Sequence, residues 1–299
     1  CIKNRPMRIT FGKFDFGLLG DMAGFSFFIF LNEISNQINW TVDTTLLGII
    51  SGTAATAIYG VGSQINQYYM ALSTSISGVF TPQINRIVAR GEGDEQLTKL
   101  FTRVGRIQFM LLMLVLTGFV FVGEPFICAW GGEEYGAAYW IALLLIAPVT
   151  VPLIQNIGIA IQGAKNWHQF RSKVYVCMAI GNALVSIPLG MKFGGIGCAL
   201  GTAISMVVGN GFIMNWYYQT HIGLDMRYFW KHILSIVPAM LPAVALGIIA
   251  VRLHTFTGYA GVVTFAVPYA AVYAVGLYLF AMDESEKNMV RGVMRKIRR

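Results

Sequence analysis

The eight residues from Asn36 to Asp43, NQINWTVD, lie inside an apolar run that extends from Met22 to Ile50. As a helix, such a run is long enough to cross the hydrocarbon core of a membrane, which is about 30 Å thick. Amide and carboxylate side chains are costly in that setting and mark functional or packing positions. The stretch therefore predicts a membrane-spanning helix with one polar face.

The rest of the chain is equally apolar. Hydrophobic residues form 56% and charged residues 12% of its 299 positions, and the mean hydropathy is +0.60. A soluble domain carries roughly twice this share of charge. We therefore predict an all-α integral membrane protein with about eight transmembrane helices. The predicted spans are residues 22–50, 53–80, 107–129, 138–162, 173–190, 194–217, 233–251 and 259–281.

The basic residues are distributed unevenly between the predicted loops. They gather in the amino-terminal segment, in alternate loops and in the tail, whereas only Lys192 and Arg252 fall on the opposite side. One of these basic loops contains Lys165, Arg171 and Lys173. Because cytoplasmic loops retain Lys and Arg, both ends of this chain are predicted to be cytoplasmic. Attraction to anionic membrane lipid accounts for the net charge of +8 without a nucleic acid partner.

Two basic segments show helical spacing of apolar residues. The first runs from Asp94 to Arg106, and the second is the tail. Each is predicted to be an amphipathic helix lying at the membrane interface. The apolar positions are Leu97, Leu100, Phe101 and Val104 in the first helix and Met289, Val290, Val293, Met294 and Ile297 in the second.

The sequence lacks the common motifs of catalysis and metal binding. Its cysteines, Cys1, Cys128, Cys177 and Cys198, have no paired spacing, and its four histidines have no metal-ligand spacing. Motifs for a nucleophilic serine, a phosphate-binding loop or a dinucleotide are also absent from the sequence. We expect no disulfide, metal, cofactor or catalytic residue, and we do not expect an enzyme.

The polar residues of the first span form a stripe. Asn32, Asn36, Asn39 and Asp43 are spaced by four, three and four residues, which places them within about 60° of one another on a helix. A charged group near the bilayer centre costs about 2.5 to 3.5 kcal/mol, and Glu33 adds another. The stripe must therefore face protein or water, either as a helix interface joined by amides or as the lining of a pathway.

Polar side chains recur in the spans that follow. Gln64 and Gln67 lie in the second span, Asn156 in the fourth, Asn182 in the fifth and Asn210 in the sixth, whereas the last two spans contain almost none. This distribution favours a pathway inside a six-helix bundle. The predicted parts are a cytoplasmic loop (1–21), a six-helix transporter lobe (22–218), two additional transmembrane helices (219–282) and a basic cytoplasmic tail (283–299).

The stretch from Phe30 to Gly91 resembles the seventh and eighth helices of oligosaccharide flippases. These are the polysaccharide-transporter branch of the multidrug, oligosaccharidyl-lipid and polysaccharide exporter superfamily. The resemblance continues through GAKNWHQFRSK (163–173) and GGIGCALGTAIS (194–205). Members of the family enclose a central cavity between two six-helix lobes and move lipid-linked glycans out of the cytoplasmic leaflet.

This resemblance implies that the chain contains family helices 7 to 14 and that an amino-terminal lobe precedes Cys1. It also implies alternating access, a polyprenyl-diphosphate-linked oligosaccharide and membrane lipids as partners, and the bacterial cytoplasmic membrane as the location. A drug or cation exporter of the same superfamily would share the fold. A membrane enzyme of glycan assembly fits less well, because the predicted outer loops are short.

The resemblance also suggests roles for the polar residues, because an amide both donates and accepts hydrogen bonds and so suits sugar hydroxyls. The expected cavity lining is Asn32, Asn36, Asn39, Asp43, Gln64, Gln67 and Asn156. Asp43 and Glu33 are candidates for ion coupling, and Arg86 and Arg90 for phosphate contact. Since the central part of each predicted span lacks Lys and Arg, cavity cations are expected from the amino-terminal lobe.

Overall fold

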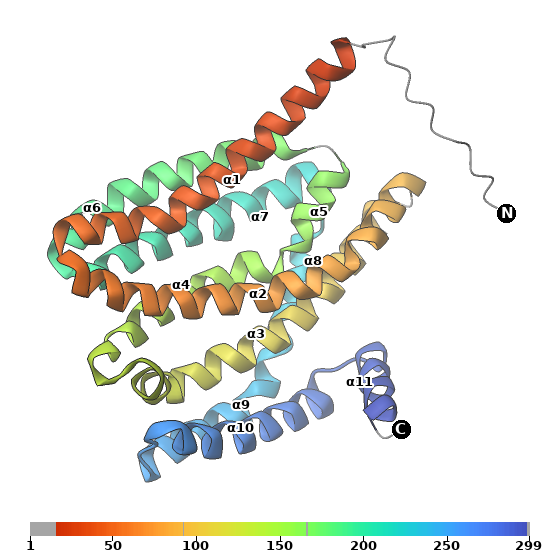
Figure 1. Cartoon of the computed structure of the whole chain (residues 1–299). Coiled ribbons are helices and arrows are strands. Elements are labelled where there is room, and N and C mark those ends of the chain that lie inside the picture. Colours follow the sequence, from red (N-terminus) through yellow and green to blue (C-terminus); the bar gives the residue numbers. More distant parts are fainter. Residues whose placement is uncertain (1–15, 92, 166, 298–299) are drawn as a thin grey trace, which may run out of the picture.

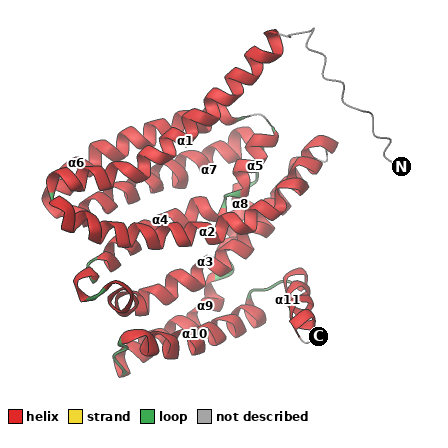
Figure 2. Cartoon of the chain, in the orientation of Figure 1, coloured by secondary structure: helices red, strands yellow, loops and turns green. Residues whose placement is uncertain are grey.

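The computed structural model of the chain describes residues 16–91, 93–165 and 167–297. All regular structure in these ranges is helical (Figure 2), which confirms the predicted all-α class. The elements in order are α1 (Phe16–Ile50), α2 (Gly52–Arg90), α3 (Asp94–Gly131), η1 (Glu133–Tyr135), α4 (Ala138–Ile154), α5 (Ile157–Ala164), α6 (His168–Met206), η2 (Val207–Ile213), α7 (Met214–Tyr217), η3 (Tyr218–Ile222), α8 (Met226–Leu234), α9 (Val237–Leu253), α10 (Gly258–Phe280) and α11 (Glu284–Ile297).

Several of these helices are suited to a membrane. Within the described residues, four helical runs are long and apolar enough to cross one: 94–131, 169–222, 226–253 and 258–280. The pair α4 and α5, bent by 42°, makes a fifth if it is counted as one span. Helix α2 is also long, but its amides and hydroxyls lower its hydropathy. In α1, a shorter apolar helical stretch, Thr41–Ile50, lies within the described residues. The structure thus supports a multi-pass membrane protein, and the count of eight spans stays a prediction.

The run from 169 to 222 consists of two arms. At Gly194 the backbone leaves the helical region, with φ 58° and ψ −137°. Glycine adopts this left-handed φ readily because it has no Cβ. The two arms then lie against each other, since the Ser186 hydroxyl donates to the carbonyl of Cys198 at 3.3 Å. The break falls at the predicted boundary between the fifth and sixth spans.

The helices are arranged in successive layers (Figure 1). Helix α1 packs along α6, α2 packs along α4, and α3 lies between α4 and α10. Helices α9 and α10 pack on each other and contact the remainder of the chain mainly through α3. The polar spans and the two apolar carboxyl-terminal spans therefore occupy opposite sides of the molecule.

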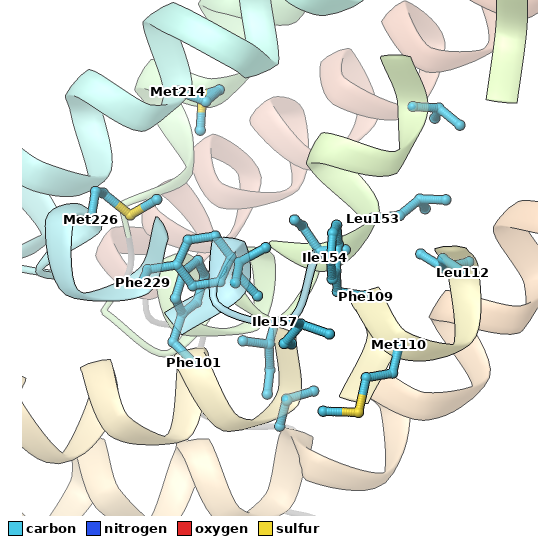
Figure 3. Close-up of a cluster of buried hydrophobic side chains, with 14 of the residues drawn as sticks. Phe101, Phe109, Met110, Leu112, Leu153, Ile154, Ile157, Met214, Met226 and Phe229 are labelled. Carbon is cyan, nitrogen blue, oxygen red and sulfur yellow. The ribbon is translucent and has the colours of Figure 1, made fainter. Parts of the chain in front are cut away.

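The largest apolar cluster extends from α2 to α10, and Figure 3 shows the part of it around α3, the α4–α5 bend and α8. The rings of Phe101 and Phe229 have centroids 4.8 Å apart. Gly105 permits this approach, because a Cβ there would lie 2.6 Å from the Phe229 ring and 2.7 Å from the carbonyl oxygen of Ile154. The segment from Asp94 to Arg106 is helical as predicted, but the expectation of an interfacial apolar face is wrong. Leu97, Leu100, Phe101 and Val104 are buried against protein.

Helix α11 begins with a reciprocal pair of hydrogen bonds between Asp283 and Glu286. The backbone N–H of Asp283 donates to the Glu286 carboxylate, and the N–H of Glu286 donates to the Asp283 carboxylate. This reciprocal pattern caps the amino-terminal end of the helix. The predicted apolar face of the tail, Met289, Val290, Val293, Met294 and Ile297, lies outside the described side chains.

Candidate substrate cavity

A cavity of about 350 Å³ lies between α2, the α4–α5 bend, α6 and the segment from η2 to η3. Apolar and methionine side chains form much of its wall, so its polar groups are few and placed at definite points. Such a wall with a small number of convergent polar groups is typical of ligand sites. The polar lining consists of Thr74, Gln155, Asn156, Arg171, Tyr175, Asn210 and Tyr218.

The bend between α4 and α5 brings two amides into this cavity. Pro152 lies inside α4 and lacks the N–H of a regular helical residue. Gln155 and Asn156 follow at the break, where Gln155 Nε2 donates to Asn215 Oδ1 at 3.0 Å and Asn156 Nδ2 donates to Ser77 Oγ at 2.8 Å. Both amides are thereby held in fixed orientations beside the cavity.

Arg171 supplies a cation to the same cavity, from the first turn of α6. It is 7% exposed, and its Nη2 donates to the Tyr175 hydroxyl at 2.7 Å. Tyr175 in turn donates to Asn210 Oδ1 at 3.3 Å. Nε and Nη1 of Arg171 have no hydrogen-bond partner, and none of the ion pairs within the described residues includes this arginine.

A buried guanidinium with unused donors and no carboxylate partner is costly to fold. Its planar N–H groups match the oxygens of phosphate or carboxylate, often in pairs. Arg171 can therefore bind an anion that enters the cavity, while Gln155, Asn156 and Asn210 can bond hydroxyl groups beside it.

This position corrects the assignment of Arg171 to a basic loop. The expectation that cavity cations come only from another lobe is also wrong for this cavity. Hydropathy places Arg171 with Lys165 and Lys173 outside the span, but α6 begins at His168 and carries it inward. A signal was present, because Arg171, Tyr175, Met178 and Asn182 are spaced by four, three and four residues and so share one helical face.

The other residues singled out in the sequence have varied positions. Asn156 lines the cavity, whereas Gln64 is half-buried and Gln67 exposed on α2. Glu33 is exposed on α1. Arg86 and Arg90 are exposed near the end of α2. The side chains of Asn32, Asn36 and Asn39 lie outside the described residues, so their part in a cavity stays a prediction.

Asp43 occupies a second buried polar site, away from the cavity lining. It is 1% exposed and lies where α1 meets α2 and both arms of α6. Its Oδ2 accepts hydrogen bonds from the hydroxyls of Tyr59, at 2.6 Å, and Thr202. Ser186 donates to Asn182 Oδ1 next to Thr202. Asp43 Oδ1 has no hydrogen-bond partner, and none of the ion pairs in the described part of the chain includes Asp43.

A carboxylate with one unused oxygen inside an apolar bundle is stable only if it holds a proton or faces a cation. The hydroxyls of Tyr59 and Thr202 orient one oxygen, and the other remains available. The group of residues Asp43, Tyr59, Thr202, Asn182 and Ser186, here called the Asp43 cluster, can therefore bind a proton or a small hard cation. Among the described residues, groups of three or more His, Cys, Asp and Glu that could hold a metal are absent.

Comparisons with known proteins point in one direction. Residues 5–139 match the model of a family described as polysaccharide biosynthesis protein. Over 172 residues the chain is 24% identical to the probable flippase AglR of Haloferax volcanii. That similarity covers 56% of this chain and 36% of the length of AglR. No solved structure matches the chain.

Proposed function

Because both similarities support assignment of this chain to the polysaccharide flippases, we propose that it forms part of a transporter for lipid-linked oligosaccharide. Flipping such a lipid breaks no covalent bond. It requires a polar shelter for the sugars and the diphosphate while the polyprenyl tail stays among the lipids. The cavity beside the α4–α5 bend offers the two kinds of group that this task needs, amides and a cation.

The observation that carries the proposal is the buried Arg171. In this assignment its unused Nε and Nη1 donate to the diphosphate, and Tyr175 and Asn210 hold the guanidinium in place. Gln155 and Asn156 bond sugar hydroxyls next to the phosphate. Arg86 and Arg90, at the exposed end of α2, contact the diphosphate on its way to the cavity.

The polar residues of α1 and α2 extend this path. We assign Asn32, Asn36, Asn39, Gln64 and Gln67 to the lining used by the remainder of the glycan. The irregular segments allow the helices to rearrange around it: the 42° bend between α4 and α5, the break at Gly194 and the π-helical η2. Discontinuous helices of this kind are typical of transporters that open alternately to the two sides.

The same proposal includes the finer expectations from the sequence. These are a bacterial cytoplasmic membrane as the location, both ends of the chain on its cytoplasmic side, and a second lobe that completes the cavity. The polar shelter in the described chain is small, which supports a contribution from further helices.

The test of the cavity is the substitution Arg171→Gln in the full-length protein. Loss of a charged hydrogen bond to the diphosphate is expected to lower the rate of lipid-linked oligosaccharide translocation by at least about tenfold. Arg171→Lys is expected to be intermediate, because it keeps the charge without the planar fork. The assay is translocation in proteoliposomes, and Lys173→Gln, an exposed cation two residues away, is the matched control.

Three outcomes separate the alternatives. Wild-type rates in Arg171→Gln would exclude this arginine from substrate binding. Equal losses in Arg171→Gln and Lys173→Gln would indicate a general effect of charge. Export of organic cations that is unaffected by either substitution would favour a drug exporter, although a cavity with an unpaired arginine and without a lining carboxylate suits anionic cargo.

We also propose that Asp43 couples transport to a proton or sodium gradient, with Glu33 as the second candidate. The unused Oδ1 of Asp43 and its burial support the first assignment. In the full-length protein, Asp43→Asn is expected to leave substrate binding intact and to abolish the dependence of translocation on the gradient. Glu33→Gln is the comparison. Unchanged gradient dependence in Asp43→Asn would rule out coupling through this carboxylate.

A further inference from the structure

The first turns of α3 have a polar face as well as an apolar one. Lys99, Thr102, Arg103 and Arg106 lie on the side of the helix opposite Phe101 and its buried neighbours. The apolar side packs on protein, as described above. The polar side faces α8 and the turn between α10 and α11, so both sides of this segment are occupied by parts of the chain.

A groove of about 460 Å³ remains between these elements. Its walls include the four polar residues of α3, Tyr228 from α8 and Asp283 from the turn that precedes α11. Figure 1 shows α11 beside the end of α10, on the side of the molecule away from α1 and α6. The groove is separate from the cavity that contains Arg171, since the two share no lining residue.

Two groups in this groove have unused hydrogen-bonding capacity. Thr102 is 3% exposed, and its hydroxyl has no hydrogen-bond partner. Arg103 is exposed, and within the described residues it takes part in no ion pair or hydrogen bond. By contrast, Arg106 is paired with Glu286, and Lys99 is paired with Glu95 at 2.6 Å.

An apolar hollow lies between α3 and α10, farther along α3 and on another face of that helix. Val115, Phe119, Val262 and Ala266 are among the residues that line it, and its volume is about 300 Å³. Val115 lies 12 residues beyond Arg103, which corresponds to about 18 Å along the helix axis. Beside the groove, Leu279 and Phe280 near the end of α10 are exposed apolar side chains. A ligand with a phosphate and long apolar chains would match the groove and this apolar surface, whereas free phosphate would use only the groove.

We propose that this groove binds the phosphate of an anionic phospholipid headgroup, with Arg103 and the Thr102 hydroxyl as its donors. Basic pockets between membrane helices commonly bind such headgroups. Lys99 and Arg106 are each paired with a carboxylate, so Arg103 supplies the free positive charge, and Asp283 limits the net charge of the groove. The acyl chains lie against the exposed apolar side chains at the end of α10. This inference does not depend on the transported substrate.

The test is a binding titration of the purified full-length protein in neutral detergent, followed by native mass spectrometry. The probes are phosphatidylglycerol, phosphatidylcholine with the same acyl chains, and inorganic phosphate. Arg103→Gln is expected to weaken phosphatidylglycerol binding about fivefold, the usual contribution of one cation near a membrane surface. Thr102→Val, which keeps the shape and charge of the site, is expected to weaken it about threefold.

Arg227→Gln is the matched control, because Arg227 is an exposed cation on α8 that does not line the groove. The affinity of the Arg227→Gln protein for phosphatidylglycerol is expected to stay within about twofold of the wild-type value. Equal weakening by Arg103→Gln and Arg227→Gln, or no effect of Thr102→Val, would overturn the site. Displacement of the lipid by inorganic phosphate at similar concentrations would assign the groove to free phosphate and overturn the lipid assignment.

Discussion

Arg106 and Arg171 are equally buried, each 7% exposed, yet their surroundings differ. Arg106 donates twice to the Glu286 carboxylate, at 2.8 and 2.9 Å, and also to the carbonyls of Ala281 and His232. Arg171 has the Tyr175 hydroxyl as its hydrogen-bond partner and retains two unused nitrogen atoms. Burial alone therefore does not distinguish a structural arginine from one that is free to bind a ligand.

The difference lies in what each guanidinium faces. Arg106 joins α3 to α8, to the end of α10 and to α11, so its charge and most of its donors are used within the fold. Arg171 faces a cavity with amides on the opposite wall. The first arrangement stabilises one arrangement of helices, and the second leaves binding capacity for an anion.

Arg106→Met should produce the larger loss of stability. Removing one partner of a buried ion pair leaves the Glu286 charge unpaired, which is expected to lower the free energy of unfolding by about 3 to 5 kcal/mol. The measurement is thermal or denaturant unfolding of the purified protein in detergent. Arg103 is an exposed arginine on the same helix, and Arg103→Met should change the free energy of unfolding by no more than about 0.5 kcal/mol.

The double substitution Arg106→Met with Glu286→Leu is expected to recover part of this loss, because it removes both charges. If Arg106→Met costs no more than Arg103→Met, the ion pair does not stabilise the fold. Arg106 would then not be a structural arginine, and its contrast with Arg171 would not hold.

Arg171→Met should have the smaller effect on stability. It removes one hydrogen bond, worth about 1 kcal/mol, and also a buried charge without an acidic partner. These contributions oppose each other, so the free energy of unfolding is expected to change by less than about 1.5 kcal/mol in either direction. The same unfolding measurement applies. A loss as large as that of Arg106→Met would show that Arg171 is structural.

Apolar runs made most of the helices predictable, because about 20 apolar residues are needed to cross a membrane whatever the tertiary fold. The resemblance to flippases, carried by Phe30 to Gly91, is supported by the family match over residues 5–139. The element against which each helix packs was harder to predict from the sequence. Leu97, Phe101 and Val104 predicted one apolar face correctly, but their spacing could not reveal that α8 rather than lipid would cover it.

The candidate site was predictable only in part. Asn156 was recognised from its depth in an apolar span, whereas Arg171 was assigned to a loop because two other cations surround it in the sequence. Asp43 was recognised as a costly carboxylate. Its partner Thr202 lies 159 residues away, and a contact between such distant segments has no local signal in a single sequence.

The ion pair between Arg106 and Glu286 also has a consequence for biogenesis. Its partners are 180 residues apart, and the carbonyl acceptors of Arg106 are 126 and 175 residues beyond it. During synthesis, α3 therefore enters the membrane with an arginine that has none of its final partners. Only after α11 has left the ribosome can Glu286 pair with this charge, so the ion pair forms later than the helices that lie between its partners in the sequence.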